Sequence, residues 1–375
     1  MGKNLCEIVE RMKVVIVLLV VQAALAGVIV FYKLALVEGM SMRVLIAYRF
    51  IFATACITPL AFIFERESKA NLTWKVVFQG VLSGFFGGAL GPNLFIASLS
   101  LTSSTYATAM SNLVPIATFI LAAILRLERL GMKTLAGQAK LWGTLLSIGG
   151  AMFLTFYKGK ELNLWSTNIN IVKHGGHRHT STKHAAVGDQ VLGSLLALAS
   201  CLAFAIWYII HAKMGENYPF TYSASALFCI TASIEATIYT IITDRNWSDW
   251  KLGWNLRLLS VVYTGAVGSG LTVVLMSWCL RLRGPLFVSI FNPLTLVYVA
   301  IVGSLIFDEK LSIGSIIGSV IIIIGVYVVL WGKAKEKKTW EQLAAQPERP
   351  SEPQTVDVVI QDADHCCDPS KQISS

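Results

Sequence analysis

Two charged side chains, Arg49 and Glu235, lie alone inside long apolar runs of the sequence. A charge in such surroundings is costly, and residues of this kind are functional candidates by default. Counted along their runs, the two lie at similar depths, so they could form an ion pair that acts as a gate. The alternative is that each side chain extends separately to the nearest polar surface.

A second pattern couples an asparagine to a proline. Asn112 precedes Pro115 by three residues, and Asn292 directly precedes Pro293. Proline removes a backbone donor and frees a carbonyl one turn back. The amide of asparagine offers both donors and an acceptor, which suits the ammonium and carboxylate groups of a zwitterion. The pattern predicts a polar cavity lining; the alternative is a helix kink whose asparagine bonds to a neighbouring helix.

Other polar or aromatic side chains within apolar runs are candidates for the same lining. They are Gln22, Asn93 and Trp278, with Trp207 and Tyr263. Aromatic residues in such runs more often pack or anchor than bind a ligand. We therefore place these five behind the two asparagines as predicted substrate-binding residues.

The segments that carry these residues have the composition of membrane helices. The chain has 375 residues, 55% hydrophobic and 14% charged, whereas soluble proteins carry roughly 25% charge. Its apolar runs are long enough to cross a hydrocarbon core of roughly 30 Å. We predict an all-α membrane protein with ten transmembrane helices. They span Val14–Lys33, Val44–Phe64, Val76–Leu94, Thr105–Leu125, Leu141–Tyr157, Val191–Ile210, Tyr222–Ile242, Leu258–Leu280, Pro285–Phe307 and Ile313–Leu330.

The basic residues predict the orientation of these spans. In the first half, Lys and Arg number 10 in the connections on the side of the N-terminus and 2 on the other side. Cytoplasmic connections carry this excess, so we expect both termini in the cytoplasm. The first apolar run is longer than that of a signal peptide, and we predict that it is retained as a span. The net charge of +9 is spread over short connections, whereas nucleic-acid binding requires a contiguous basic patch.

The two halves of the chain repeat each other. One constant offset in sequence aligns Gly88 with Gly268 and Asn112 with Asn292. Two further matches follow in the same order: Glu128-Arg129-Leu130 with Glu309-Lys310-Leu311, and Gly143-x6-Gly150 with Gly318-x6-Gly325. Five spans per half place the copies in opposite senses across the bilayer, which predicts inverted repeats. In transporters built this way the substrate lies near the midplane, between the halves.

This repeat gives the predicted domain organisation. We expect a cytoplasmic N-terminus (1–13), a first repeat (14–157), a connecting loop (158–188), a second repeat (189–332) and a disordered cytoplasmic tail (333–375). Small residues at spacings of four predict close helix packing. They occur at Gly80, Gly84 and Gly88, and at Gly314 and Gly318.

The polar segments predict no metal site or cofactor. His174, His177, His179 and His184 lie in the connecting loop without cysteine or acidic neighbours, so a solvated linker is favoured over a metal site. The seven cysteines show no disulfide or zinc spacing. The spans contain neither paired acids nor a P-loop, and we predict that the protein is not an enzyme.

The segment from Thr102 to Ala122, followed by Arg126-Leu-Glu-Arg, resembles the plant nodulin-like branch of the drug/metabolite transporter superfamily. That branch includes the Walls-Are-Thin-related proteins and the UMAMIT amino-acid facilitators. Gln22 and Tyr48-Arg49 also fit its pattern, and the resemblance covers about 14–333. It implies two EamA-type repeats and bidirectional, often export-directed, transport of amino acids; some relatives carry auxin.

The resulting expectation is a transporter of amino acids or related small organic solutes, with the solute and the lipid bilayer as partners and no nucleic acid. We expect it in the plasma membrane, with the tonoplast as the alternative. Auxin or another metabolite, or a proton-coupled antiport, remain alternative functions, although the first span contains no acidic residue. A non-transporting receptor or scaffold is the alternative from a different class.

Overall fold

The structure is a computed structural model that describes residues 2–66, 72–102, 107, 110–125, 134–157, 161–162, 187–244, 247–253, 255–306 and 311–344. The chain divides into two units, Met1–Glu336 and Lys337–Ser375, and the account below concerns the first. The predicted site residues all lie in that unit. The connecting-loop histidines, the two Glu-basic-Leu motifs apart from Leu311, and the tail beyond residue 344 lie outside the described residues.

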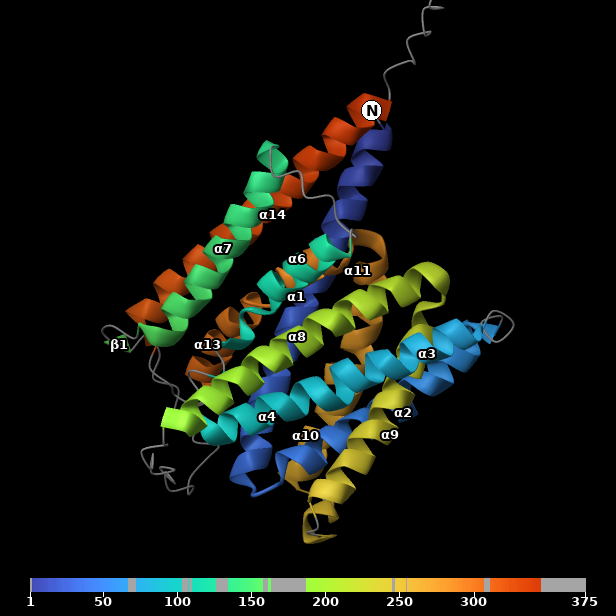
Figure 1. Cartoon of the computed structure of the whole chain (residues 1–375), viewed down its shortest axis with the longest axis vertical. Coiled ribbons are helices and arrows are strands. Elements are labelled where there is room, and N and C mark those ends of the chain that lie inside the picture. The colour runs from blue at the N-terminus through green and yellow to red at the C-terminus, as the bar shows by residue number, and fades with distance from the viewer. Residues whose placement is uncertain are drawn as a thin grey trace, which may run out of the picture. The chain divides into compact units, whose positions relative to one another are not determined.

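The described secondary structure is helical apart from one short pair of strands. In chain order the helices are α1 (Gly2–Val37), α2 (Met42–Phe64), α3 (Trp74–Ser83), η2 (Gly84–Leu90), α4 (Gly91–Leu101), α6 (Val114–Ile124), α7 (Leu135–Phe156), α8 (Val187–Asn217), α9 (Thr221–Thr243), η3 (Trp247–Trp250), α10 (Leu256–Val262), η4 (Tyr263–Leu271), α11 (Thr272–Arg283), α12 (Pro285–Ser289), α13 (Leu294–Ile306) and α14 (Ile313–Ala344). Strands β1 (Glu161–Leu162) and β2 (Leu311–Ser312) pair antiparallel. Figure 1 shows how these helices are arranged.

The prediction of an all-α membrane protein is confirmed. Within the described residues, nine helices are long and apolar enough to cross a membrane. The predicted fourth span, Thr105–Leu125, is represented only by the 11-residue helix α6, because residues 103–106 and 108–109 lie outside the described part of the chain. The count of ten therefore remains a prediction.

The start of α7 differs from the predicted fifth span, which began at Leu141. The helix begins at Leu135, after Thr134, whose hydroxyl oxygen accepts a hydrogen bond of 3.2 Å from the Gly137 amide. This is an N-cap, which satisfies an amide left free in the first turn. Lys140 was expected to precede the span, but it lies within the helix and is 4% exposed. Its charge did not end the helix.

Two membrane helices contain a π-helical segment at equivalent positions. Segment η2 separates α3 from α4, and η4 separates α10 from α11. Each segment contains three glycines, whose poor helix propensity lowers the cost of a wider turn. The offset that aligns Gly88 with Gly268 also superposes the two segments in sequence. Because π-helices are rare and often occur at functional sites, their recurrence in both halves is a structural repeat in its own right.

The predicted close packing at glycines is confirmed on α3 and η2. A Cβ atom at Gly84 would lie 2.8 Å from the backbone nitrogen of Ala232, and one at Gly88 would lie 3.0 Å from the Ala232 Cα atom. The Thr231 hydroxyl on α9 also donates a hydrogen bond of 3.0 Å to the Gly80 carbonyl. Helix α9 thus packs directly against the backbone of α3 and η2.

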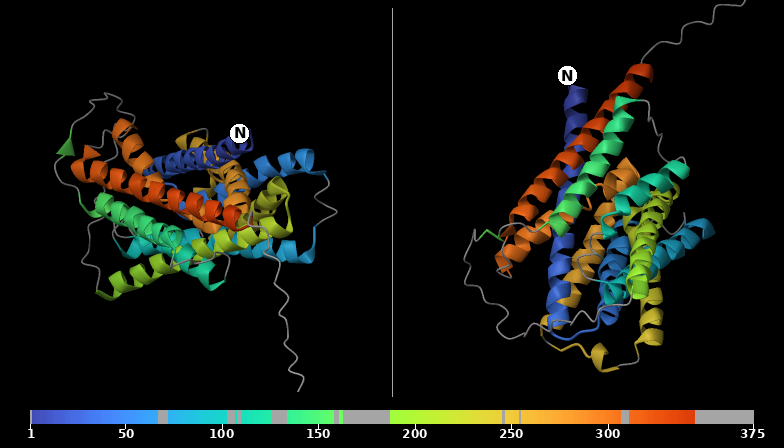
Figure 2. Two further views of the ribbon diagram at one scale, coloured as in Figure 1. Left: turned by 90° about the horizontal axis from the view of Figure 1, so that it is seen from above. Right: turned by 60° about the vertical axis from the view of Figure 1, so that its left-hand side comes forward.

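Equivalent helices from the two halves also pack against each other, in antiparallel directions. On α7 and α14, Gly143 lies opposite Gly325, and Gly150 lies opposite Gly318. A Cβ atom at Gly143 would lie 2.8 Å from the Gly325 carbonyl oxygen, and one at Gly150 would lie 3.0 Å from that of Gly318. The two helices run side by side in Figures 1 and 2. The same four glycines form the repeat match, but the antiparallel contact pairs the first of each motif with the second of the other.

Helices α2 and α9 form the second antiparallel pair. At one end, the Glu65 carboxylate accepts hydrogen bonds from the Tyr222 amide (3.1 Å) and the Ser223 amide (2.8 Å). At the other end, the Thr240 hydroxyl donates to the Arg43 carbonyl over 3.2 Å. A carboxylate at the start of α9 satisfies free amides and complements the helix dipole.

Candidate functional site

The two Asn-Pro positions do interrupt helices. Asn112 lies in a turn directly before α6, and Asn292 lies in the turn between α12 and α13. Pro115 occupies the first turn of α6, where a missing N–H costs nothing. Pro293 is the residue before α13. The prolines therefore stand where helices begin, and the breaks lie on their N-terminal sides.

Both asparagines have buried surroundings. The Tyr208 hydroxyl on α8 donates a hydrogen bond of 3.0 Å to Asn292 Oδ1. Tyr208 and Asn112 are buried, and Asn292 is half-buried. Helix α6, which follows Asn112, contacts both α8 and α12. The bond to Tyr208 fits the alternative in which asparagine joins helices, and it leaves the Asn292 amide nitrogen for another partner.

Gln22 is 0% exposed on α1. Its Oε1 atom accepts a hydrogen bond from the Thr295 hydroxyl on α13. Its Nε2 atom is buried and has no hydrogen-bond partner. Since buried polar groups are nearly always bonded, a free donor at such a position requires an explanation.

Asn93 and Trp207, on neighbouring helices, also have buried polar atoms without a hydrogen-bond partner: an acceptor on Asn93 and a donor on Trp207. Asn93 is buried on α4 and donates a hydrogen bond of 2.7 Å to the Ala89 carbonyl, while its Oδ1 atom has no partner. Trp207 on α8 packs over Gly87 of η2, and its buried indole nitrogen also has no partner. Among the described residues, the buried polar atoms without a partner therefore include an amide acceptor on α4 and donors on α1 and α8. The others are the hydroxyls of Thr54, Thr58, Ser98 and Ser223, Gln79 Oε1 and Glu235 Oε2.

The other two aromatic candidates pack. Trp278 is half-buried against the main hydrophobic core. Tyr263 packs against Phe31 with the rings tilted by 31° and their centroids 4.5 Å apart, and its hydroxyl donates to the Ala24 carbonyl over 3.4 Å. For these positions the structure provides a packing role, and a role of Trp278 in substrate binding remains a prediction.

Arg49 and Glu235 do not form an ion pair in this structure. Arg49 donates to the Tyr32 hydroxyl on α1 over 2.7 Å and, on η4, to the Gly268 carbonyl over 3.0 Å and to the Ser269 hydroxyl. One Glu235 carboxylate oxygen, Oε2, is buried without a hydrogen-bond partner. The expected pairing fails because the guanidinium donors already have neutral acceptors on α1 and η4. Arg49 therefore joins α1 to the second π-helix.

A buried histidine is the main polar residue that the sequence did not reveal. His211 on α8 lies between Ser83 Oγ, 3.1 Å from Nδ1, and Ser277 Oγ, 2.5 Å from Nε2. Ser277 Oγ lies 3.0 Å from Ser225 Oγ. This chain joins α3, α8, α11 and α9 through four side chains. His211 lies one residue beyond the predicted span Val191–Ile210, and the sequence pattern indicated no role for it.

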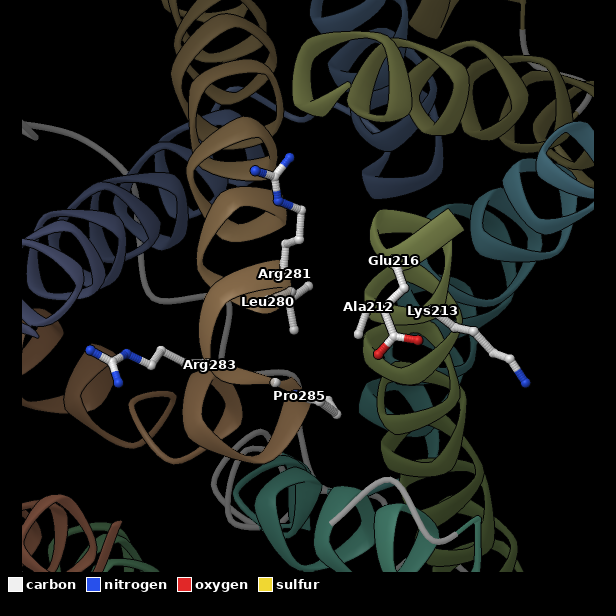
Figure 3. Close-up of a pocket in the computed structure, with 8 residues that line it drawn as sticks. Ala212, Lys213, Glu216, Leu280, Arg281, Arg283 and Pro285 are labelled. Atoms are coloured by element: carbon white, nitrogen blue, oxygen red, sulfur yellow. The ribbon is translucent and has the colours of Figure 1, made fainter. Parts of the chain in front are cut away.

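A pocket opens beside the end of α8. It has a volume of about 240 Å³ and lies between α8 and the α11–α12 junction. Figure 3 shows the Glu216 carboxylate in the space between these elements. The lining residues are Ala212, Lys213, Glu216, Leu280, Arg281, Arg283, Gly284 and Pro285. Figure 3 shows the Lys213 and Arg283 side chains directed away from this space, so the Glu216 carboxylate is the charged group that faces it.

The part of the chain that the structure describes contains no cluster of side chains that could bind a metal ion. No group of three or more His, Cys, Asp or Glu side chains there could hold a metal ion. The described cysteines, Cys56, Cys201, Cys229 and Cys279, are free thiols.

Comparison with known proteins gives the family. The model of the EamA-like transporter family matches residues 12–156 and again residues 191–331. WAT1-related protein At1g68170 of Arabidopsis thaliana is 39% identical over 88% of this chain and 92% of its own length. WAT1-related protein At5g13670 of the same plant is 40% identical over 88% and 86%. A solved crystal structure superposes with a TM-score of 0.64 over 87% of this chain and 99% of that chain, and its 16% identity shows the fold alone. Two family matches in one chain and relatives at this identity lead to one conclusion: the chain belongs to the EamA-like transporter family, with plant WAT1-related proteins as its relatives.

Proposed function

We propose that this membrane transporter of small solutes is a bidirectional carrier of amino acids that works by alternating access. The free hydrogen-bonding groups of Gln22, Asn93 and Trp207 carry this proposal. Leaving a buried donor or acceptor unbonded costs about 1–3 kcal/mol. A solute that bonds to these groups would recover that cost.

The chemistry of these groups matches an amino acid. Gln22 Nε2 and Trp207 Nε1 are donors, which suit a carboxylate, and Asn93 Oδ1 is an acceptor, which suits an ammonium group. The groups come from α1, α8 and α4, so a solute held by all three would bridge both halves of the chain. Asn112 and Asn292, at the two helix breaks, complete the proposed lining, with Pro115 and Pro293 fixing where the breaks occur.

Alternating access requires two halves that can exchange conformations. We propose ten spans in two inverted repeats, 14–157 and 189–332. The antiparallel contacts of α7 with α14 and of α2 with α9 support inversion, since each contact joins helices at equivalent places in the two halves. The π-helices η2 and η4 add a repeated backbone feature. In such transporters the solute binds between the repeats.

We also propose an orientation with both termini in the cytoplasm of the plasma membrane. The basic residues of the first half support it. In this orientation the pocket beside Glu216 and Arg281 opens to the cytoplasm. The opposite side is closed by hydrogen bonds, among them Ser41 Oγ to Asp244 over 2.6 Å and the Tyr48 hydroxyl to the Trp250 carbonyl over 2.8 Å. This arrangement fits a carrier that loads from the cytoplasm and exports.

One observation favours auxin, an aromatic carboxylate, as an alternative solute. Trp207, Tyr208 and Phe228 form a buried aromatic cluster, in which the Trp207 ring centroid lies 4.8 Å from that of Tyr208 and 5.6 Å from that of Phe228. A cluster of this kind could stack with an indole ring, while a zwitterion gains little from it.

The test is an efflux assay in proteoliposomes loaded with radiolabelled amino acids in one arm and with labelled indole-3-acetate in the other. For Gln22→Leu we expect a loss of about tenfold to a hundredfold in apparent affinity, the equivalent of about 1–3 kcal/mol. Gln138→Leu, the same change at an exposed position of α7, is the matched control. Equal efflux from both variants in the amino-acid arm would show that Gln22 does not contact the solute. Efflux in the indole arm alone would favour auxin.

A further inference from the structure

His211 has an unusually complete set of neutral partners. It is 2% exposed, and each ring nitrogen faces a serine hydroxyl from another helix, Ser83 on α3 and Ser277 on α11. Trp207 and Phe228 enclose the ring, with centroids 5.8 and 5.6 Å away. A neutral imidazole fits this site because it has one donor and one acceptor.

The hydrogen count assigns the tautomer. The Ser277 hydroxyl hydrogen is used on the Val273 carbonyl, 2.6 Å away. With that bond in place, Ser277 Oγ accepts from His211, and the ring hydrogen is then on Nε2. Nδ1 is then the acceptor, and it receives the hydroxyl hydrogen of Ser83. The free lone pair of the ring, the place where a further proton binds, is directed at Ser83.

Charged groups are present on the packed helices but do not bond to the ring. They are Lys75 of α3, Asp189, Lys213 and Glu216 of α8, Glu235 of α9, and Arg281 and Arg283 of α11, and η2 has none. The titratable Tyr208, one turn away on α8, donates to Asn292. Within the described residues, then, the hydrogen-bond and ring partners of His211 are all neutral groups.

A route for a proton lies beside the ring. Ala212, the next residue on α8, lines the pocket, and so does Leu280, one turn beyond Ser277 on α11. The pocket also contains the Glu216 carboxylate (Figure 3). The pocket lining thus includes the sequence neighbour of His211 and a residue one turn from its partner Ser277.

We propose that His211 is a proton-binding site that couples solute movement to a proton gradient. The inference rests on the proposed carrier function and adds the coupling ion to it. When the pocket side opens, a proton from water adds to Nδ1, which becomes a donor to Ser83 Oγ. The Ser83 hydroxyl must then turn its own hydrogen to another acceptor. Release of the proton restores the original bond, so no other group gains or loses a proton.

The position of Ser83 links this reversal to the backbone. Ser83 is the last residue of α3, immediately before the π-helix η2. Its neighbour Gly84 packs against the backbone of α9. A change of hydrogen-bond direction at Ser83 therefore acts at the junction where the helix already departs from α-helical geometry, a place suited to a conformational step.

The experiment uses full-length protein in proteoliposomes and a radiolabelled mixture of the proteinogenic amino acids. Exchange at equal pH measures the carrier, and accumulation under an imposed gradient of about one pH unit measures coupling. That gradient sustains up to about a tenfold concentration ratio for one proton per solute. His211→Gln retains a donor and an acceptor but binds no proton. His177→Gln, in the connecting loop, is the matched control.

We expect wild type and His177→Gln to accumulate solute several-fold under the gradient, and His211→Gln to exchange at equal pH without accumulating. A gradient that has no effect on an exchanging wild type, or an equal effect in His211→Gln, overturns the proposal. Absence of exchange in the wild type instead refutes the amino-acid carrier.

A second measurement judges the proton site without a solute or a substitution at His211. Replacing the other five histidines by glutamine leaves His211 as the sole histidine for nitrogen NMR. Those residues are His174, His177, His179, His184 and His365. Ring nitrogen chemical shifts that change between about pH 5 and about pH 8 support proton binding. Shifts that remain those of a neutral imidazole over this whole range overturn it.

Discussion

Replacing Asn292 by leucine separates the structural role of this residue from its proposed role in binding. In the structure the Tyr208 hydroxyl donates to Asn292 Oδ1 over 3.0 Å, and Tyr208 is buried. Asn292→Leu removes the acceptor but leaves the hydroxyl in the core. Tyr208→Phe removes the hydroxyl but leaves the carbonyl of Asn292 without its partner. The double variant removes both groups.

The magnitude follows from the cost of unbonded groups. An unsatisfied buried hydroxyl costs about 1–3 kcal/mol. Direct coupling between side chains of membrane helices is smaller, about 0.6 kcal/mol on average and up to about 1.7 kcal/mol. We therefore expect each single variant to lower the free energy of unfolding by about 1–3 kcal/mol. The double variant should be more stable than the sum of the two losses by an amount within that coupling range.

The assay combines denaturant unfolding in detergent micelles with efflux from proteoliposomes of matched protein content. If Asn292 also binds the solute through its amide nitrogen, the double variant regains stability but not transport. Strictly additive losses in stability would refute the hydrogen bond as a structural link. Transport that returns together with stability would refute the binding role.

Three further predictions concern packing, charge and topology. Gly150→Leu should greatly reduce the yield of folded protein, because a Cβ atom there would lie 2.8 Å from the Ile322 nitrogen. Gly149→Leu is the control, since a Cβ atom at Gly149 would have no atom within 4 Å. Equal yields of the two variants in gel filtration would contradict the α7–α14 contact. Arg49→Ala should lower the amount of folded protein, and the double variant Arg49→Glu with Glu235→Arg should not restore it. Recovery of the double variant in a surface-abundance assay would instead support an ion pair between the two residues. A reporter fused after Lys333 should be protease-protected in sealed right-side-out vesicles, and cleavage without permeabilisation would falsify the orientation.

Helix positions were predictable because hydropathy alone decides which segments leave water. The predicted spans fall on observed helices, but the agreement at their ends varies. The ends of α2 and α9 agree within two residues, whereas α1 begins 12 residues before its predicted span and α14 ends 14 residues after it. The glycine contacts follow from spacing. The early start of α7 has a physical cause. A lysine was taken to end a membrane segment, yet Lys140 is buried within the helix. The cost of a charge depends on the partners that the fold supplies, and sequence patterns contain no record of them.

The π-helices and the partners of Arg49 were beyond sequence reasoning for a related reason. The glycines of η2 and η4 permit a wider turn but equally permit an α-helix, and tertiary contacts make the choice. Arg49 and Glu235 were matched by charge and depth, but the structure satisfies the arginine with Tyr32 and two groups of η4. For such a residue the available neutral acceptors matter as much as an opposite charge. His211 was missed because it lies one residue beyond a predicted span.

The two halves share their backbone breaks but not their polar chemistry. Under the constant offset of the repeat, Asn112 and Asn292 are equivalent, as are η2 and η4. Most other buried polar groups have an apolar counterpart. Gln22 aligns with Leu202, Arg49 with Cys229, Asn93 with Val273 and His211 with Phe31. Alternating access by exchange of repeat conformations needs symmetry only in the backbone. In the proposed mechanism, a single set of polar side chains, supplied unequally by the halves, would face each side of the membrane in turn, so that one solute site and one proton site would serve both directions of transport.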